Sequence, residues 1–213
     1  MRRYWRSLAS ALVLAMAACA SHSVRAEAQG PASAPQDPSL PPPGLGSLRQ
    51  DQVGLRMQTT ELAVRVIPLD EHVTRLLSPD AYQSLQQMRQ SRQAAIDTAA
   101  RAAGYDSTAT FMVTFFGLQP QVRFNPDQLA ISSQNVTYRP IGIVPITPRW
   151  SDGVLDQRQQ QAAIYLFDPA VQVLRPFTVI YGVQSSDAWS DVLRILNSER
   201  ARVLSRAQQP ARP

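Results

Sequence analysis

The sequence has no lysine: all 21 of its Lys/Arg-type cations are arginine, set against 16 acidic residues. Among 213 residues there are one cysteine and two histidines. One cysteine excludes a disulfide within the chain, and two histidines leave little material for a zinc site or for a Ser–His nucleophile pair. The fold must therefore be held by its hydrophobic core, which a folded part of roughly 150 residues can supply without covalent staples.

Short motifs of catalysis and cofactor binding are also missing. The chain contains no Gly-x-Ser-x-Gly, His-Glu-x-x-His, Cys-x-x-Cys or Walker loop. We therefore assign no catalytic residue and expect no cofactor and no metal site.

The amino terminus has the three parts of a secretory leader. Arg2, Arg3 and Arg6 precede an apolar run over 8–16, and small residues follow. An uncleaved membrane span is the alternative, but the strongly apolar part covers about 10 residues and a span needs about 20. The sequence therefore predicts export.

The residues Met16, Ala17, Ala18 and Cys19 resemble the lipobox of bacterial lipoproteins, with methionine where that class usually carries leucine. The resemblance implies that residues 1–18 are a lipoprotein signal peptide and that Cys19 becomes the lipidated first residue. A diacylglyceryl thioether and an amide-linked chain would then hold the protein on a membrane. Ala20, in place of aspartate, implies the outer membrane if the source has one.

Two other kinds of processing stay open. Ordinary cleavage after Ala20 or after Ala26 would release a secreted or periplasmic soluble protein. The pair Arg2-Arg3 also matches the start of a twin-arginine signal, although Tyr4 and Trp5 do not continue that pattern.

The formal charge of +5 would favour a nucleic-acid partner, but part of that charge belongs to the predicted leader. Loss of its three arginines leaves 18 cations and 16 acids, which is nearly neutral. The remaining arginines are scattered among acids and glutamines, whereas a phosphate-backbone binder concentrates them in a stripe. We expect no nucleic-acid partner.

Residues 19–52 are predicted to be the lipidated cysteine followed by a disordered tether. The segment is dense in Pro, Ala, Ser and Gly, including 38–44, and such a composition cannot offset the entropy of ordering. The sequence predicts one domain over 53–207 and a disordered tail over 208–213.

Hydrophobic periodicity predicts an α+β domain. Period-two alternation marks strands near 57–67, 110–116, 122–124, 129–131, 136–146, 163–167 and 177–181. Ser78 and Pro79 begin a long helix that Gly104 ends, and a cap cluster at 185–187 begins a C-terminal helix. We therefore expect a mostly antiparallel, sandwich-like sheet of six or seven strands. The long helix precedes it, and the C-terminal helix packs on it.

Segment 138–150 is the candidate interaction surface. Its prolines predict an edge strand, and its ends carry the candidate partner-binding residues Tyr138, Arg139, Arg149 and Trp150. The alternative is that the prolines block edge-to-edge aggregation while Trp150 covers the core.

Three hypotheses follow for function. The first is a membrane-anchored, non-catalytic envelope lipoprotein that acts as a binding or assembly module with an envelope partner. The second is an envelope hydrolase with Asp-based acid/base chemistry, for which Asp127, Asp152, Asp156 and Asp168 are the candidates near turns. The third is a carrier of a small apolar ligand, which needs a closed apolar pocket.

Overall fold

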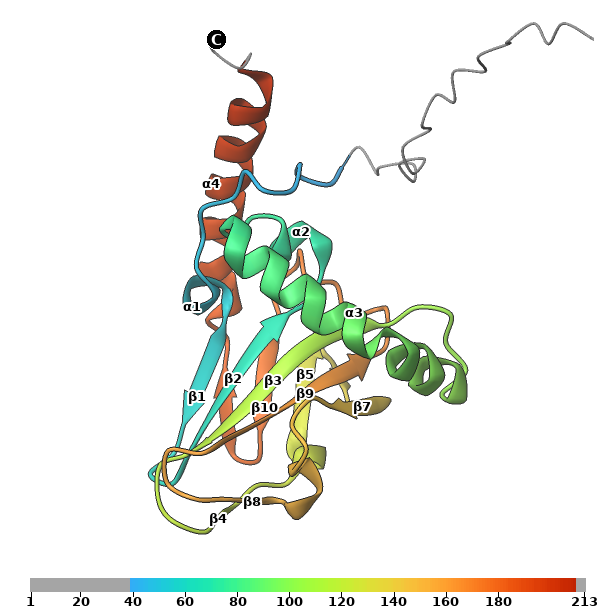
Figure 1. Cartoon of the computed structure of the whole chain (residues 1–213), viewed down its shortest axis with the longest axis vertical. Helices are drawn as coiled ribbons and strands as arrows, with labels where there is room; N and C mark the ends of the chain where they lie inside the picture. The colour runs from blue at the N-terminus through green and yellow to red at the C-terminus, as the bar shows by residue number, and fades with distance from the viewer. Residues whose placement is uncertain (1–38, 210–213) are drawn as a thin grey trace, which may run out of the picture. The chain divides into compact units, whose positions relative to one another are not determined.

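The computed structural model describes residues 39–209, which form part of one compact unit with an α+β architecture (Figure 1). Two antiparallel sheets face each other across the core, and helices lie outside them. The predicted leader, Cys19 and the tether up to residue 38 lie outside the described residues, as do residues 210–213 of the predicted tail.

The larger sheet has five strands, all paired antiparallel. Its third strand is apolar on both faces, as a central strand must be. In order across the sheet the strands are β1 (Leu55–Gln58), β2 (Leu62–Pro68), β3 (Ala109–Gly117), β9 (Gln160–Phe167) and β7 (Gly142–Pro145).

The second sheet packs on the first through large apolar side chains. Phe115 of β3 meets Tyr181 with ring centroids 5.3 Å apart, and Phe111 meets Phe177 at 5.8 Å. This sheet has the order β11 (Gln184–Ser186), β10 (Thr178–Tyr181), β5 (Leu129–Ser133) and β6 (Val136–Tyr138). A separate ribbon pairs β4 (Val122–Arg123) with β8 (Val154–Leu155).

The described residues therefore contain eleven strands, where the sequence predicted six or seven. Two of the additional strands are short, since β8 has two residues and β11 has three. The others arise because the segments near 57–67 and 136–146 each form two strands, β1 with β2 and β6 with β7. A two- or three-residue strand shows too little alternation for periodicity to detect. The segments 163–167 and 177–181 are strands as predicted, but they belong to different sheets.

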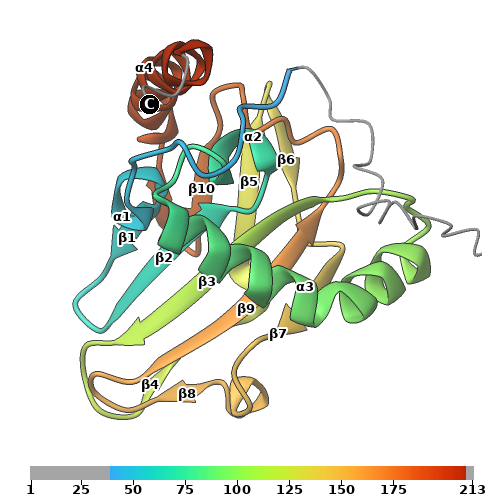
Figure 2. The same cartoon turned by 45° about the horizontal axis from the view of Figure 1, so that its top comes forward.

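Helix α3 (Pro79–Ala102) crosses the outer face of the five-stranded sheet (Figure 2). Leu85, Ile96 and Ala100 are buried beneath it. A Cβ on Gly142 of β7 would lie 3.2 Å from the Ala99 methyl, so glycine allows this close approach. The apolar stripe of the helix therefore packs on the domain's own sheet.

The remaining helices close the ends of the sandwich. Helix α4 (Trp189–Gln208) starts with a fully buried tryptophan, which stacks on Phe177 at 4.8 Å and donates its indole N–H to the carbonyl oxygen of Val173 at 2.8 Å. The short helices are α1 (Gln50–Val53), α2 (Glu71–Thr74), η1 (Pro126–Gln128) and η2 (Trp150–Asp152).

Residues 45–52, which the sequence assigned to the tether, lie in the folded unit. Leu48 is 5% exposed, and its backbone bonds to Leu76 and Ser78 at 3.1 and 2.8 Å. A Cβ on Gly46 would lie 2.3 Å from the carbonyl of Leu76, so only glycine fits there. The polar and Pro-rich composition predicted disorder, but Leu45 and Leu48 of this stretch pack on the core. The folded part therefore begins earlier than residue 53.

Candidate functional site

Segment 138–150 runs from the edge of one sheet to the edge of the other. Strand β6 is the last strand of the four-stranded sheet, and β7 is the last strand of the five-stranded sheet. Pro140 falls between them and Pro145 ends β7. The prediction that this segment is an edge is confirmed.

The four candidate partner-binding residues differ in their placement. Trp150 is only 8% exposed, and its ring lies against Phe124 and Phe115 with centroids 5.3 and 5.8 Å away. Arg149 is exposed and pairs with Asp152 at 2.9 Å. Tyr138 is half-buried and Arg139 is exposed. Trp150 thus covers the core, as the alternative interpretation expected, and partner binding by this segment stays a prediction.

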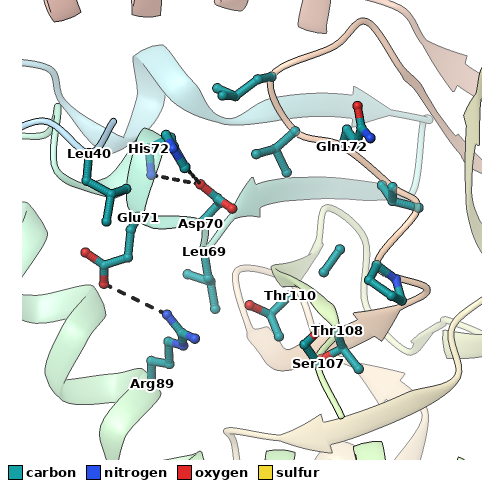
Figure 3. A pocket seen from close by; sticks show the side chains of 15 residues that line it. Leu40, Leu69, Asp70, Glu71, His72, Arg89, Ser107, Thr108, Thr110 and Gln172 are labelled. Atoms are coloured by element: carbon teal, nitrogen blue, oxygen red, sulfur yellow. Dashed lines mark hydrogen bonds and ion pairs between the residues drawn. The ribbon is translucent and has the colours of Figure 1, made fainter. Parts of the chain in front are cut away.

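A cavity of about 470 Å³ forms a different candidate site, here called the tether-root pocket (Figure 3). It opens between the start of α2, helix α3, the start of β3 and the loop from β9 to β10. Leu40, the second described residue, also lines it, so the chain that leads back to the predicted anchor enters the domain here. The polar lining consists of Asp70, Glu71, His72, Arg89, Ser107, Thr108, Thr110 and Gln172.

One wall of the pocket carries a chain of three polar groups. Asp70 Oδ1 accepts hydrogen bonds from the backbone N–H of His72 at 2.8 Å and contacts His72 Nδ1 at 2.9 Å. The other ring nitrogen, Nε2, lies 3.3 Å from the hydroxyl of Ser39. Asp70 caps the start of α2, because its side chain satisfies a backbone donor of that helix.

The opposite wall carries charge held by α2 and α3. Glu71 accepts from Arg75 at 2.5 Å, from the amide of Gln86 and from the Tyr82 hydroxyl at 3.4 Å, and Arg89 lies 4.0 Å away. Burial raises the pKa of Glu71, but the hydrogen bonds from Arg75 and Gln86 outweigh burial, so the pKa is lowered and the carboxylate is ionised. Arg89 Nε is buried without a hydrogen-bond partner in the described structure.

The pocket is therefore suited to a small ligand that forms hydrogen bonds. It offers carboxylate acceptors, hydroxyl groups at Thr108 and Thr110, and an unsatisfied guanidinium donor. Its apolar wall comes from Leu69, Val171 and Val173. This mixture differs from the closed apolar pocket that a carrier of an apolar ligand would need.

Sequence analysis did not identify this site. No local motif joins positions 40, 70–72, 89, 107–110 and 172. The side chains meet because β2 ends beside the start of β3, and such pairing of distant segments has no signature in a single sequence.

The aspartates proposed for acid/base catalysis have separate partners. Asp152 pairs with Arg149, Asp156 accepts from Gln121 at 2.6 Å, and Asp168 accepts from Tyr105 at 3.0 Å. Asp127 follows Asn125, whose side chain accepts its backbone N–H at 3.0 Å. Nothing in these contacts brings two of the four carboxylates together across a cleft.

The described part of the chain contains neither a cluster of metal ligands nor a helix suited to span a membrane. Residues 39–209 contain no group of three or more His, Cys, Asp or Glu side chains placed to hold a metal ion. No helix among them has the length and apolar character needed to cross a membrane.

Comparison with known proteins adds no family. No family model matches the chain, and neither a curated protein nor a solved structure matches it.

Proposed function

We propose that this chain is a lipid-anchored protein of the bacterial cell envelope whose sandwich domain is a non-catalytic binding module. The leader and the lipobox-type residues ending in Cys19 support the anchor. The tether-root pocket supports binding, and it is the observation on which the proposal chiefly rests. A cavity whose walls carry carboxylate, hydroxyl and guanidinium groups is suited to hold a ligand that forms hydrogen bonds.

The position of the pocket suits an envelope ligand. The anchored chain enters the domain at Leu40, so the pocket lies at the membrane-proximal end of the chain. Cell-wall polymers present hydroxyl, amide and carboxylate groups, and these match the hydroxyls, carboxylates and guanidinium of the pocket. We therefore expect a soluble fragment of cell-wall polymer to occupy it.

The test is calorimetric titration of the purified chain with a panel of soluble cell-wall fragments. At least one fragment is expected to bind saturably. Replacing Gln172 with tryptophan, which places a bulky ring at the rim, and Arg89→Gln should each weaken binding by about tenfold or more. The matched control is Arg175→Gln, which changes an exposed residue of the same loop that does not line the pocket. Absence of saturable binding, or equal binding by all variants, would contradict the proposal.

A second candidate function rests on one observation: Ser39, His72 and Asp70 are connected in the order of a serine-hydrolase triad. Binding is favoured over hydrolysis because helix capping already explains the position of Asp70. In addition, the His72 and Asp70 side chains are 24% and 39% exposed, whereas the acid of such a triad is normally buried.

A fluorophosphonate probe separates the two candidates, because it reacts with an activated serine. The binding proposal predicts that the chain and its Ser39→Ala variant are labelled equally weakly. Strong labelling that the substitution abolishes would favour hydrolysis instead.

A further inference from the structure

Helix α3 leaves part of the outer face of the five-stranded sheet uncovered (Figure 1). A second cavity, of about 390 Å³, lies on this face. We name it the arginine cleft, after Arg56 of β1, Arg65 of β2 and Arg158 of the turn between β8 and β9. Phe116 and Gly117 of β3 complete its floor. None of its lining residues is acidic.

Two of these arginines occupy an electrostatically costly position. Arg56 and Arg65 are direct partners in the β1–β2 register, so their side chains leave the same face of the sheet side by side. Like charges placed directly opposite each other destabilise a strand pair. Arg56 donates to Gln58 at 3.0 Å, and no described carboxylate forms an ion pair with Arg56, Arg65 or Arg158.

The guanidinium of Arg65 lies against an aromatic ring, and one of its N–H groups has no described hydrogen-bond acceptor. Its carbon lies 5.6 Å from the ring centroid of Phe116, within range of a cation–π contact. Its Nε is buried and has no hydrogen-bond partner among the described residues. A buried donor of this kind costs free energy unless an acceptor fills the site.

Arg158 reaches the cleft through a tightly held turn. Its backbone N–H donates to the carbonyl of Gly117 at 2.8 Å, and its φ of 65° is unusual for a residue other than glycine. A Cβ on Gly117 would lie 2.4 Å from the carbonyl oxygen of Asp156, so glycine lets the turn sit against β3. The Asp156 carboxylate accepts from Gln121 and does not line the cleft.

We infer that the arginine cleft binds a phosphate-bearing ligand. Arginine forms paired N–H···O bonds with phosphate oxygens, and three uncompensated guanidinium groups around one cavity match an anion of one or two negative charges. The ring of Phe116 offers an apolar surface beside the anion for the remainder of the ligand. This inference is independent of the tether-root pocket and of its occupant.

The phosphate could be free in solution or part of a phospholipid headgroup, and two soluble probes separate these sources. Inorganic phosphate represents the first, and glycerophosphoglycerol, the headgroup diester of phosphatidylglycerol without acyl chains, represents the second. Each is titrated calorimetrically into the full chain in a detergent that carries no charge and at low ionic strength. Binding should weaken as salt is added, because the cleft is accessible to counterions.

At least one probe is expected to bind saturably. Arg65→Gln and Arg158→Gln should each raise its dissociation constant by about tenfold or more, while Arg175→Gln, a loss of charge outside the cleft, leaves it unchanged. Arg158 is exposed, so its substitution tests the cleft even if Arg65→Gln disturbs the sheet. Tighter binding of glycerophosphoglycerol supports a lipid headgroup, and tighter binding of phosphate supports a free anion. If neither probe binds saturably, or if both arginine variants bind as the parent does, the inference is wrong.

Discussion

Glu199 shows how a single buried charge fastens the amino-terminal segment to the C-terminal helix. Its side chain is 1% exposed on α4. It accepts from the backbone N–H and the hydroxyl of Ser47 at 3.0 and 2.8 Å and pairs with Arg206 at 3.0 Å. Arg206 also donates to the carbonyl of Leu45 at 2.6 Å. Residues 45–48 are therefore held by charge as well as by the burial of Leu48.

Glu199→Gln should lower the free energy of unfolding at pH 7 by about 2 kcal/mol, because hydrogen bonds to a charged group are lost. Burial raises the pKa of Glu199, but the bonds from Ser47 and Arg206 outweigh burial, so the pKa lies below its ordinary value of 4.5. A lowered folded-state pKa stabilises the fold above the unfolded pKa, and this contribution is lost as the pH falls through the folded value. The gap between parent and variant should therefore narrow below pH 4.5.

Urea denaturation at several pH values measures this gap. The matched control is Glu61→Gln, which changes an exposed glutamate and should alter stability by less than about 0.5 kcal/mol. A gap for Glu199→Gln that stays constant between neutral and strongly acidic pH would mean that the carboxylate is not held in its ionised form.

The structural role of some single residues could be predicted from the sequence, and that of others could not. Gly104 was predicted correctly as the end of a helix, because helix ends depend on local backbone geometry; it has the positive φ of 82° that ends α3. Trp150 could not be placed, because both burial and exposure fit an aromatic residue beside prolines. Glu199 gave no signal either, since its partner Ser47 lies 152 positions away.

At the scale of elements, α3 was the clearest sequence prediction. Pro79 at its first turn and Gly104 beyond its end are local signals, and both hold in the structure. The hydroxyl of Ser78 makes no capping bond, so the start of the helix depends on proline and on packing. The stripe of Leu85, Ile96 and Ala100 faces the sheet and contributes to the core.

Ile96→Ala should therefore destabilise the whole domain, with an unfolding free energy lower by about 2 to 4 kcal/mol. The reason is that Ile96 is 5% exposed and belongs to the core of the sandwich. Urea denaturation followed by circular dichroism measures the effect. Gln87→Ala, at an exposed position of the same helix, serves as the control and should change stability by less than about 0.5 kcal/mol. If Ile96→Ala changes stability as little as the control does, α3 does not pack on the sheet in solution.

Sheet pairing was harder to predict than the elements themselves. The alternation at 110–116 predicted a strand, and β3 lies there, third of five. The order of its neighbours was not accessible, because β9 pairs with β3 from about 50 residues away along the chain. The residues that line both candidate pockets are brought together by that strand order, so neither pocket could be predicted from the sequence.

At the scale of the whole molecule, the proposed lipid anchor precedes a domain in which two of the cavities are lined by polar residues. The tether-root pocket receives the chain at Leu40, and the arginine cleft lies on the uncovered face of the larger sheet. Both cavities contain an arginine Nε without a described partner, at Arg89 and at Arg65.

The anchor is the central claim, since the proposed location and the choice of ligands depend on it. The mass of the amino-terminal peptide of the mature protein, isolated from cells that express the full chain, tests it most directly. We predict a peptide that begins at Cys19 and carries the added mass of a diacylglyceryl group and an amide-linked acyl chain. An unmodified peptide that begins at Ser21 or Glu27, or one that retains Met1, would contradict the account.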